Sequence, residues 1–209
     1  MKTFDELKAE ELKNYTYHIN RMNNELTQGG LKDHEVETNK TVIGNFQTYV
    51  DNIDEVVTID IGAGVNGLID DIQKQYKAHV SYYWASFEKF VDEYLSKNYY
   101  YNLLGMNIND LLGFEGRDPM NDETCDFFRQ FANSKCGTNI PMAGTLEQAE
   151  KEYAEAYMSG DETAIDETYV HFAEVQRDSG KLKNGSDYNL LAVNQQYQEA
   201  KARCSEKNL

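Results

Sequence analysis

The chain has 209 residues, of which 36 are acidic and 20 basic, and its formal net charge is −16. With 40% hydrophobic residues it can build a folded core, which excludes global disorder. The excess of acids disfavours direct binding to nucleic acid, because such binding needs Lys and Arg to replace the counterions of the phosphates.

The cysteines and the lengths of the apolar runs indicate the cellular compartment of the protein. Three cysteines without C-x-x-C spacing favour reduced thiols in a cytoplasmic protein and give no support for a structural metal site. No stretch approaches the roughly 20 apolar residues of a membrane span. The histidines and acids match no metal-binding or catalytic motif, so we expect no cofactor, no metal and no enzymatic activity.

Two helices are expected at the start of the chain. Thr3 and Glu6 predict a capping box for a helix over residues 3–28, whose apolar residues recur at steps of three and four. The same stripe is compatible with a coiled-coil seam. Residues 36–53 fit a helix or a strand, and we favour a helix.

The middle of the chain contains two contrasting patterns. Residues 55–61, EVVTIDI, predict a strand, because most are β-branched. Residues 65–97 keep helical spacing of apolar and aromatic side chains and predict the long central helix of the core, with Trp84 buried inside it.

Residues 58–67, TIDIGAGVNG, connect these two patterns and include Asp60, Gly62 and Gly64. They resemble the first motif of S-adenosylmethionine-dependent methyltransferases, in which a glycine-rich loop follows a hydrophobic strand. The resemblance implies a cofactor-binding loop. That family also has an acidic residue at the end of a second strand about 20 positions later, where this chain continues its helical pattern. We therefore expect a tight strand-to-helix turn, with positive φ at both glycines and Asn66 as the helix cap.

The remaining elements are expected to be helical. Asp118 predicts the cap of a helix that runs to about Ser134, with Pro119 at its first position. Beyond a boundary near residue 140, Thr145 with Gln148 and then Asp161 predict the starts of two helices. A third helix is expected to begin at Ser186 or Asp187.

These elements define a mainly α fold, a helical bundle around the long central helix 65–97, and they allow a small β element near 55–61. The expected domains are a helical core over residues 1–140 and a three-helix segment over 141–209 that packs on it.

Two clusters of acidic residues are the candidate binding sites. The first cluster, at a predicted helix start, comprises Glu115, Asp118, Asp122, Glu123 and Asp126. The second cluster, across a turn between two predicted helices, comprises Glu155, Asp161, Glu162, Asp166 and Glu167. Acids at a helix start also suit the helix dipole, which is the structural alternative. Tyr99, Tyr100 and Tyr101 are expected to provide aromatic anchors beside the carboxylates.

A rigid array of carboxylates can imitate a phosphate backbone and occupy a basic channel. Small size, strong acidity and the lack of a catalytic motif make the chain similar in kind to phage-encoded anti-CRISPR and antirestriction proteins, although no residue motif is shared. The resemblance implies a DNA-mimicking inhibitor, encoded by a phage or mobile element, that acts in the cytoplasm of a bacterial host. Its partner would be a basic protein such as a CRISPR effector nuclease with its guide RNA.

Two alternatives belong to other classes of protein. A phage scaffold or adaptor would self-associate through the helix at residues 3–28, whereas a channel-blocking inhibitor can be monomeric. A methyltransferase-like domain is the second alternative.

Overall fold

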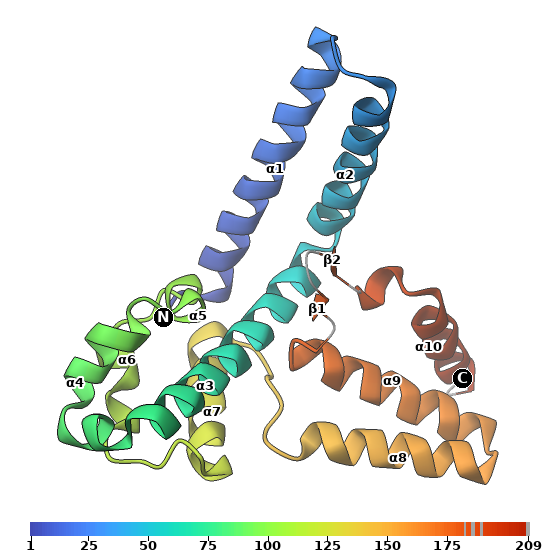
Figure 1. The fold of residues 1–209 in the computed structure, drawn as a ribbon. Coiled ribbons are helices and arrows are strands. Elements are labelled where there is room, and N and C mark those ends of the chain that lie inside the picture. The colour runs from blue at the N-terminus through green and yellow to red at the C-terminus, as the bar shows by residue number, and fades with distance from the viewer. Residues whose placement is uncertain (182, 185–186, 189, 208–209) are drawn as a thin grey trace.

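The computed structural model describes residues 1–181, 183–184, 187–188 and 190–207, and it is built mainly of helices (Figure 1). In chain order the elements are α1 (Phe4–Gln28), α2 (Asp33–Asp51), α3 (Ile53–Ala85), α4 (Phe87–Phe90), η1 (Val91–Leu95), α5 (Tyr99–Leu103), α6 (Ile108–Leu111), η2 (Leu112–Phe114), α7 (Asp122–Cys136), α8 (Thr145–Ser159), α9 (Glu162–Asp178), β1 (Lys183–Asn184), β2 (Asp187–Tyr188), η3 (Leu191–Val193) and α10 (Gln195–Lys207). η1 is a π-helix, η2 and η3 are 3₁₀-helices, and β1 pairs antiparallel with β2. The mainly α fold is confirmed.

The helices form an arm and two groups around α3 (Figure 1). α1 and α2 make an antiparallel hairpin that extends away from the other elements. α3 runs diagonally from the base of this arm, with α4–α7 gathered toward its C-terminal end. α8, α9 and α10 lie on the other side of α3.

The arm follows the first two predicted helices closely. The capping box of Thr3 and Glu6 is present, and α2 is a helix, as favoured. The apolar stripe of α1 packs on α2, with the Tyr15 ring 5.3 Å from Phe46 and 5.6 Å from Tyr49. α2 therefore covers the stripe that suggested a coiled-coil seam.

The strand predicted at residues 55–61 is wrong, because this segment lies inside α3. Val56, Ile59 and Val65 are completely buried. Apolar side chains point inward all around this part of the helix, since other elements surround it. A helix buried on every side loses the polar–apolar period that distinguishes it from a buried strand.

Gly62 and Gly64 also lie inside α3, so the predicted turn with positive φ at these glycines is wrong. Their role is close packing. A Cβ on Gly62 would lie 2.3 Å from the carbonyl oxygen of Asp178, and one on Gly64 would lie 3.1 Å from Leu104. Residues 58–67 therefore form no glycine-rich loop, and Asn66 caps no helix.

The long helix predicted at residues 65–97 is wrong in its bounds and its continuity. α3 starts twelve residues earlier, bends at His79 (φ −137°, ψ 37°) and ends before Ser86, whose backbone is extended. The π-helix η1 follows, and its Tyr94 stacks on His79 with ring centroids 4.8 Å apart. The aromatic residues therefore line a corner rather than a straight helix.

Trp84 is half exposed at this corner, so the prediction that it is buried is wrong. Its neighbours Tyr83 and Phe90 are fully buried, and the Tyr83 hydroxyl donates to the carbonyl oxygen of Phe114 (3.2 Å). The bend at His79 changes which side chains point inward, and a periodicity continued through it misplaces Trp84.

The helix predicted to start at Asp118 exists as α7, but its cap is Asn121, which accepts from the backbone N–H of Glu123 (2.8 Å). Asp118 instead closes a turn by accepting from the backbone N–H of Met120 (2.9 Å). Pro119 is buried in this turn.

The three C-terminal helices are present as α8, α9 and α10. Asp161 caps α9 as predicted, whereas the cap of α8 is Gly144 in a left-handed conformation, without a side-chain hydrogen bond. The last helix starts at Gln195, because Asp187 lies in β2; Ser186 is outside the described residues. The domain boundary near residue 140 stays a prediction.

A pair of glycine substitutions measures the close packing of α3. Gly44, inside α2, has no heavy atom within 4 Å of an added Cβ. Gly44→Ala is expected to stabilise the fold by about 0.5–1 kcal/mol through helix propensity. Gly62→Ala is expected to destabilise it by about 1–3 kcal/mol through overpacking against Asp178. Urea denaturation measures both, and stabilisation by both substitutions would contradict the contact.

A second pair tests the aromatic corner. Phe90→Ala removes a fully buried ring and is expected to cost about 3–5 kcal/mol. Trp84→Ala removes a half-exposed ring and is expected to cost about 1–2 kcal/mol, in proportion to the smaller area buried. Equal losses in chemical denaturation would show that Trp84 is as buried as Phe90.

Candidate functional site: the acidic hairpin

α8 and α9 form an antiparallel hairpin at one end of the molecule (Figure 1). Small buried residues, Ala149, Ala156 and Ala173, help the two helices to pack closely. The Tyr153 ring on α8 stacks on Phe172 of α9, with centroids 5.9 Å apart. These contacts cover the inner faces of both helices.

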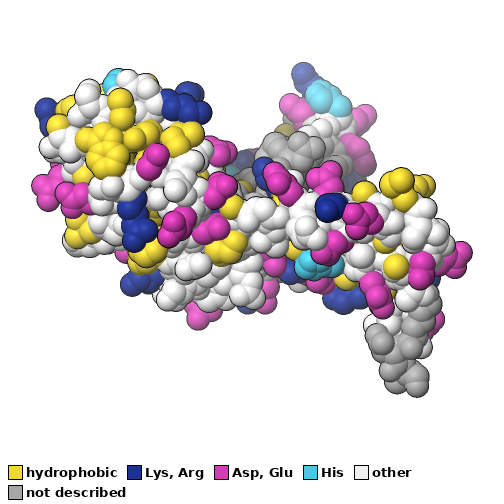
Figure 2. All heavy atoms as spheres, turned by 90° about the horizontal axis from the view of Figure 1, so that it is seen from below, with side chains coloured by type: hydrophobic (Ala, Val, Ile, Leu, Met, Phe, Trp, Pro, Cys, Tyr) yellow, Lys and Arg dark blue, Asp and Glu magenta, His cyan; other side chains and the backbone are white. Residues whose placement is uncertain are grey.

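The hairpin holds much of the negative charge of the chain. Residues 145–178 contain ten acidic and two basic residues, a net charge of −8, which is half of the −16 of the whole protein. Figure 2 shows Asp and Glu side chains spread over the lobe that contains α8 and α9. Four of these acids, Glu147, Glu150, Glu152 and Glu155, follow one another along α8.

Two acids of the second cluster have structural roles. Asp161 caps α9 by accepting from the backbone N–H groups of Thr163 (2.9 Å) and Ala164 (3.2 Å). Asp166 accepts two hydrogen bonds from Arg203 of α10, at 2.7 and 2.8 Å. These carboxylates hold the hairpin together and attach it to α10.

The other three acids of the second cluster face solvent. Glu155, Glu162 and Glu167 are exposed, and Glu155 forms a long contact with the exposed Lys151 (3.8 Å). Exposed pairs of this kind contribute roughly 0–1 kcal/mol, so they are easily exchanged for a partner's cations. Glu150 and Glu152 are exposed on the same hairpin. The sequence analysis considered the acidic residues around the turn and missed these two glutamates, although their spacing along the predicted helix could have shown them.

The first acidic cluster is split between exposed and engaged residues. Its exposed members are Glu115, Asp118, Asp122 and Glu123. Asp126 is half buried, pairs with Arg129 (2.9 Å) and accepts from the backbone N–H of Ala143 (2.7 Å). The start of α7 and the turn between α8 and α9 lie far apart in Figure 1, so the structure does not bring the two clusters together.

The three tyrosines differ in exposure. Tyr99 is exposed, and Tyr100 is half buried beside Gly67, where an added Cβ would meet its ring at 2.5 Å. Tyr101 is buried, with a relative exposure of 8%. Tyr101 therefore cannot serve as the surface anchor that its sequence position suggested.

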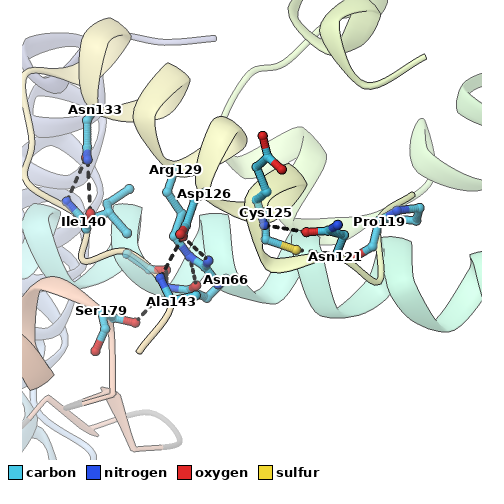
Figure 3. Close-up of polar contacts among 12 residues, drawn as sticks. Asn66, Pro119, Asn121, Cys125, Asp126, Arg129, Asn133, Ile140, Ala143 and Ser179 are labelled. Atoms are coloured by element: carbon cyan, nitrogen blue, oxygen red, sulfur yellow. Dashed lines mark hydrogen bonds and ion pairs between the residues drawn. The ribbon is translucent and has the colours of Figure 1, made fainter. Parts of the chain in front are cut away.

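A polar junction buttresses the base of the hairpin (Figure 3). The Asn66 side chain on α3 donates to the carbonyl oxygen of Ser179 (3.1 Å), just after α9, and accepts from Nε of Arg129 on α7 (3.0 Å). Arg129 in turn pairs with Asp126, which holds the Ala143 backbone before α8. One connected set of hydrogen bonds therefore links α3 and α7 to both ends of the hairpin.

The buried thiols are unsuited to nucleophilic chemistry. Burial raises the pKa of Cys136 to about 11, and it also raises the pKa of Cys125. Both therefore stay protonated at neutral pH, and the thiolate is the reactive form. Within the described residues, no group of three or more His, Cys, Asp and Glu side chains could hold a metal ion.

Among those residues there is also no helix long and apolar enough to cross a membrane.

Comparison with known proteins gives no family for this chain. It matches no protein-family model, no curated protein and no solved structure.

Two alanine variants separate structural from exposed acids. Asp161→Ala is expected to cost about 1 kcal/mol, because two N–H groups of α9 lose their acceptor. Glu167→Ala, at an exposed position of the same helix, is expected to change stability by less than about 0.5 kcal/mol. Urea denaturation of the two variants measures the difference. A cost for Glu167→Ala as large as that for Asp161→Ala would refute this division of roles.

Proposed function

We propose that this chain is a non-catalytic inhibitory protein that places its acidic α8–α9 hairpin in the basic channel of a nucleic-acid enzyme. The observation that supports the proposal is the concentration of charge: the hairpin has a net charge of −8, and many of its carboxylates are exposed. A basic channel binds such a surface as it binds a phosphate backbone, by releasing the counterions of both partners.

The interaction depends on the sum of the charges rather than on one pair. A carboxylate that meets Lys or Arg at a wet rim contributes about 0.2–1 kcal/mol. Several such pairs, with complementary long-range fields, accelerate encounter and exclude acidic partners. The caps and stacked rings of the hairpin support a rigid presentation, which lowers the entropy lost on binding.

The enzyme class we propose is a CRISPR effector nuclease bound to its guide RNA, as for the acidic inhibitors of phages and mobile elements. Such a nuclease has a positively charged channel that holds nucleic acid. It also has arginines that read a short DNA motif beside the target. The place of action is then the cytoplasm of a bacterial host. Glu155, Glu162 and Glu167 are the carboxylates proposed to contact the channel directly.

The scaffold or adaptor alternative is less favoured. It depended on the apolar stripe of α1 as a surface for self-association, and that stripe packs on α2 within the same chain, with Tyr15 and Met22 buried. Self-association through α1 would require the arm to open. The arm can still contact a partner through its outer faces.

Charge reversal tests the proposal on a purified single-chain CRISPR effector nuclease loaded with guide RNA. The triple variant Glu155→Lys, Glu162→Lys and Glu167→Lys leaves the two structural acids intact. It is expected to weaken binding at least tenfold, about 1.4 kcal/mol or more. Affinity of the unmodified protein should fall as salt rises and should fall when target DNA already fills the channel. Isothermal titration calorimetry measures all of these changes.

A matched control separates local from overall charge. The variant Glu37→Lys, Glu88→Lys and Asp92→Lys reverses three exposed acids outside the hairpin and alters the net charge equally. It is expected to weaken binding less than about threefold. Equal losses of affinity for the two triple variants would show that only the net charge matters. Equal binding with and without target DNA would refute the proposal that the hairpin occupies the nucleic-acid channel.

A further inference from the structure

The tip of the acidic hairpin exposes two adjacent apolar side chains. Tyr157 and Met158, in the last turn of α8, have relative exposures of 68% and 86%. Single exposed apolar residues are common, whereas contiguous exposed apolar surface is a feature of interaction sites. Packing between α8 and α9 does not explain the pair, since Ala156 and the stacked Tyr153 make that contact.

The backbone at the tip is well fixed. The Ser159 hydroxyl donates to the carbonyl oxygen of Ala156 (2.7 Å) and accepts from the N–H of Asp161 (3.2 Å). Gly160 makes the turn in the left-handed region with φ 72°, and Asp161 caps the next helix. The two apolar side chains therefore stand on a turn held from both sides.

Negative charge surrounds the tip. Glu155, Asp161 and Glu162 are exposed within a few residues of it, and no basic residue lies between Lys151 and Arg177. An apolar centre with a negative rim has the layout of a binding hot spot, in which polar neighbours shield an apolar anchor from water.

We infer that Tyr157 and Met158 form an anchor that inserts into an apolar depression bordered by Lys and Arg on a partner protein. This inference rests on the proposed function and specifies the surface that the hairpin recognises. Tyrosine provides a large rigid ring, and methionine adapts to the shape of the depression. Charge disfavours tip-to-tip contact with a second copy of this chain and contact with an anionic lipid surface, because each would face the carboxylates with like charge.

The exposed surface around Trp84 has a different character. Trp84 and Val80 are about half exposed, but residues 74–89 around them contain three lysines and one acidic residue. A basic partner is repelled there, so this surface serves as a control for apolar contact without a negative rim.

The probe is a pair of synthetic helical peptides, one of Lys and Leu and one in which Gln replaces every Leu. Both are titrated into the full chain by calorimetry at about 0.15 M salt, where surface charges are partly screened. We expect the Lys–Leu peptide to bind at least tenfold more tightly. The double variant Tyr157→Ser and Met158→Ser is expected to reduce this preference below threefold. Tyr17→Ser, an exposed tyrosine on α1, and Trp84→Ser are expected to keep it.

The outcomes separate the anchor from the proposed function. A preference that survives in the double variant, or is absent in the unmodified protein, would overturn the anchor even if the nuclease binds. A preference lost only in the double variant supports the anchor, and it does so even if the CRISPR nuclease fails to bind. Loss in all variants would assign the preference to general apolar contact and overturn the anchor. Equal urea midpoints for the double variant and the unmodified protein exclude misfolding.

Discussion

The fold depends on a contact of backbone against backbone, between α3 and the turn after α9. A Cβ on Gly180 would lie 2.1 Å from the backbone nitrogen of Ala63, and one on Gly62 would lie 2.3 Å from the carbonyl oxygen of Asp178. Neither position therefore accommodates a side chain without movement of the two segments. Since α8 packs on α9, this contact determines where the acidic hairpin stands relative to α3.

The polar junction at Asn66 fixes the register of this contact. Packing alone allows two helices to slide, whereas the Asn66 side chain, which donates to Ser179 and accepts from Arg129, favours a single register. Such networks lie in a medium less polar than water, where each bond is stronger and an unmade bond is costly. The acidic surface that we propose to bind a partner is thereby mounted on a rigid base, and rigidity is what distinguishes a charge pattern from a charged tail.

Local signals in the sequence were sufficient for the helices whose ends are set by neighbouring residues. The capping box at Thr3 and the cap at Asp161 act within three residues, and both were predicted correctly. The failures had distant causes. Gly62 resembled a loop glycine because its partners are more than 110 positions later in the chain. Residues 55–61 resembled a strand because neighbours bury them on all sides.

The candidate site shows the same division between local and distant information. Sequence identified the acidic hairpin and its turn, since charge runs are visible without coordinates. It could not show that Asp166 is engaged by Arg203 or that Tyr101 is buried, because both depend on elements far along the chain. The exposure of Met158 was equally hidden, as the apolar spacing of α8 does not show where α9 stops covering it.

The three cysteines allow local unfolding of the protein to be measured. Cys125 and Cys136 are both buried on α7, the helix whose Arg129 and Asp126 complete the polar junction. A buried protonated thiol reacts with an alkylating reagent only when the surrounding structure opens, so its labelling rate measures local unfolding. Cys204 on α10 is only partly buried and belongs to a different helix. The order in which the three thiols are modified thus records whether α7 and the C-terminal helix separate from the core together or one after the other.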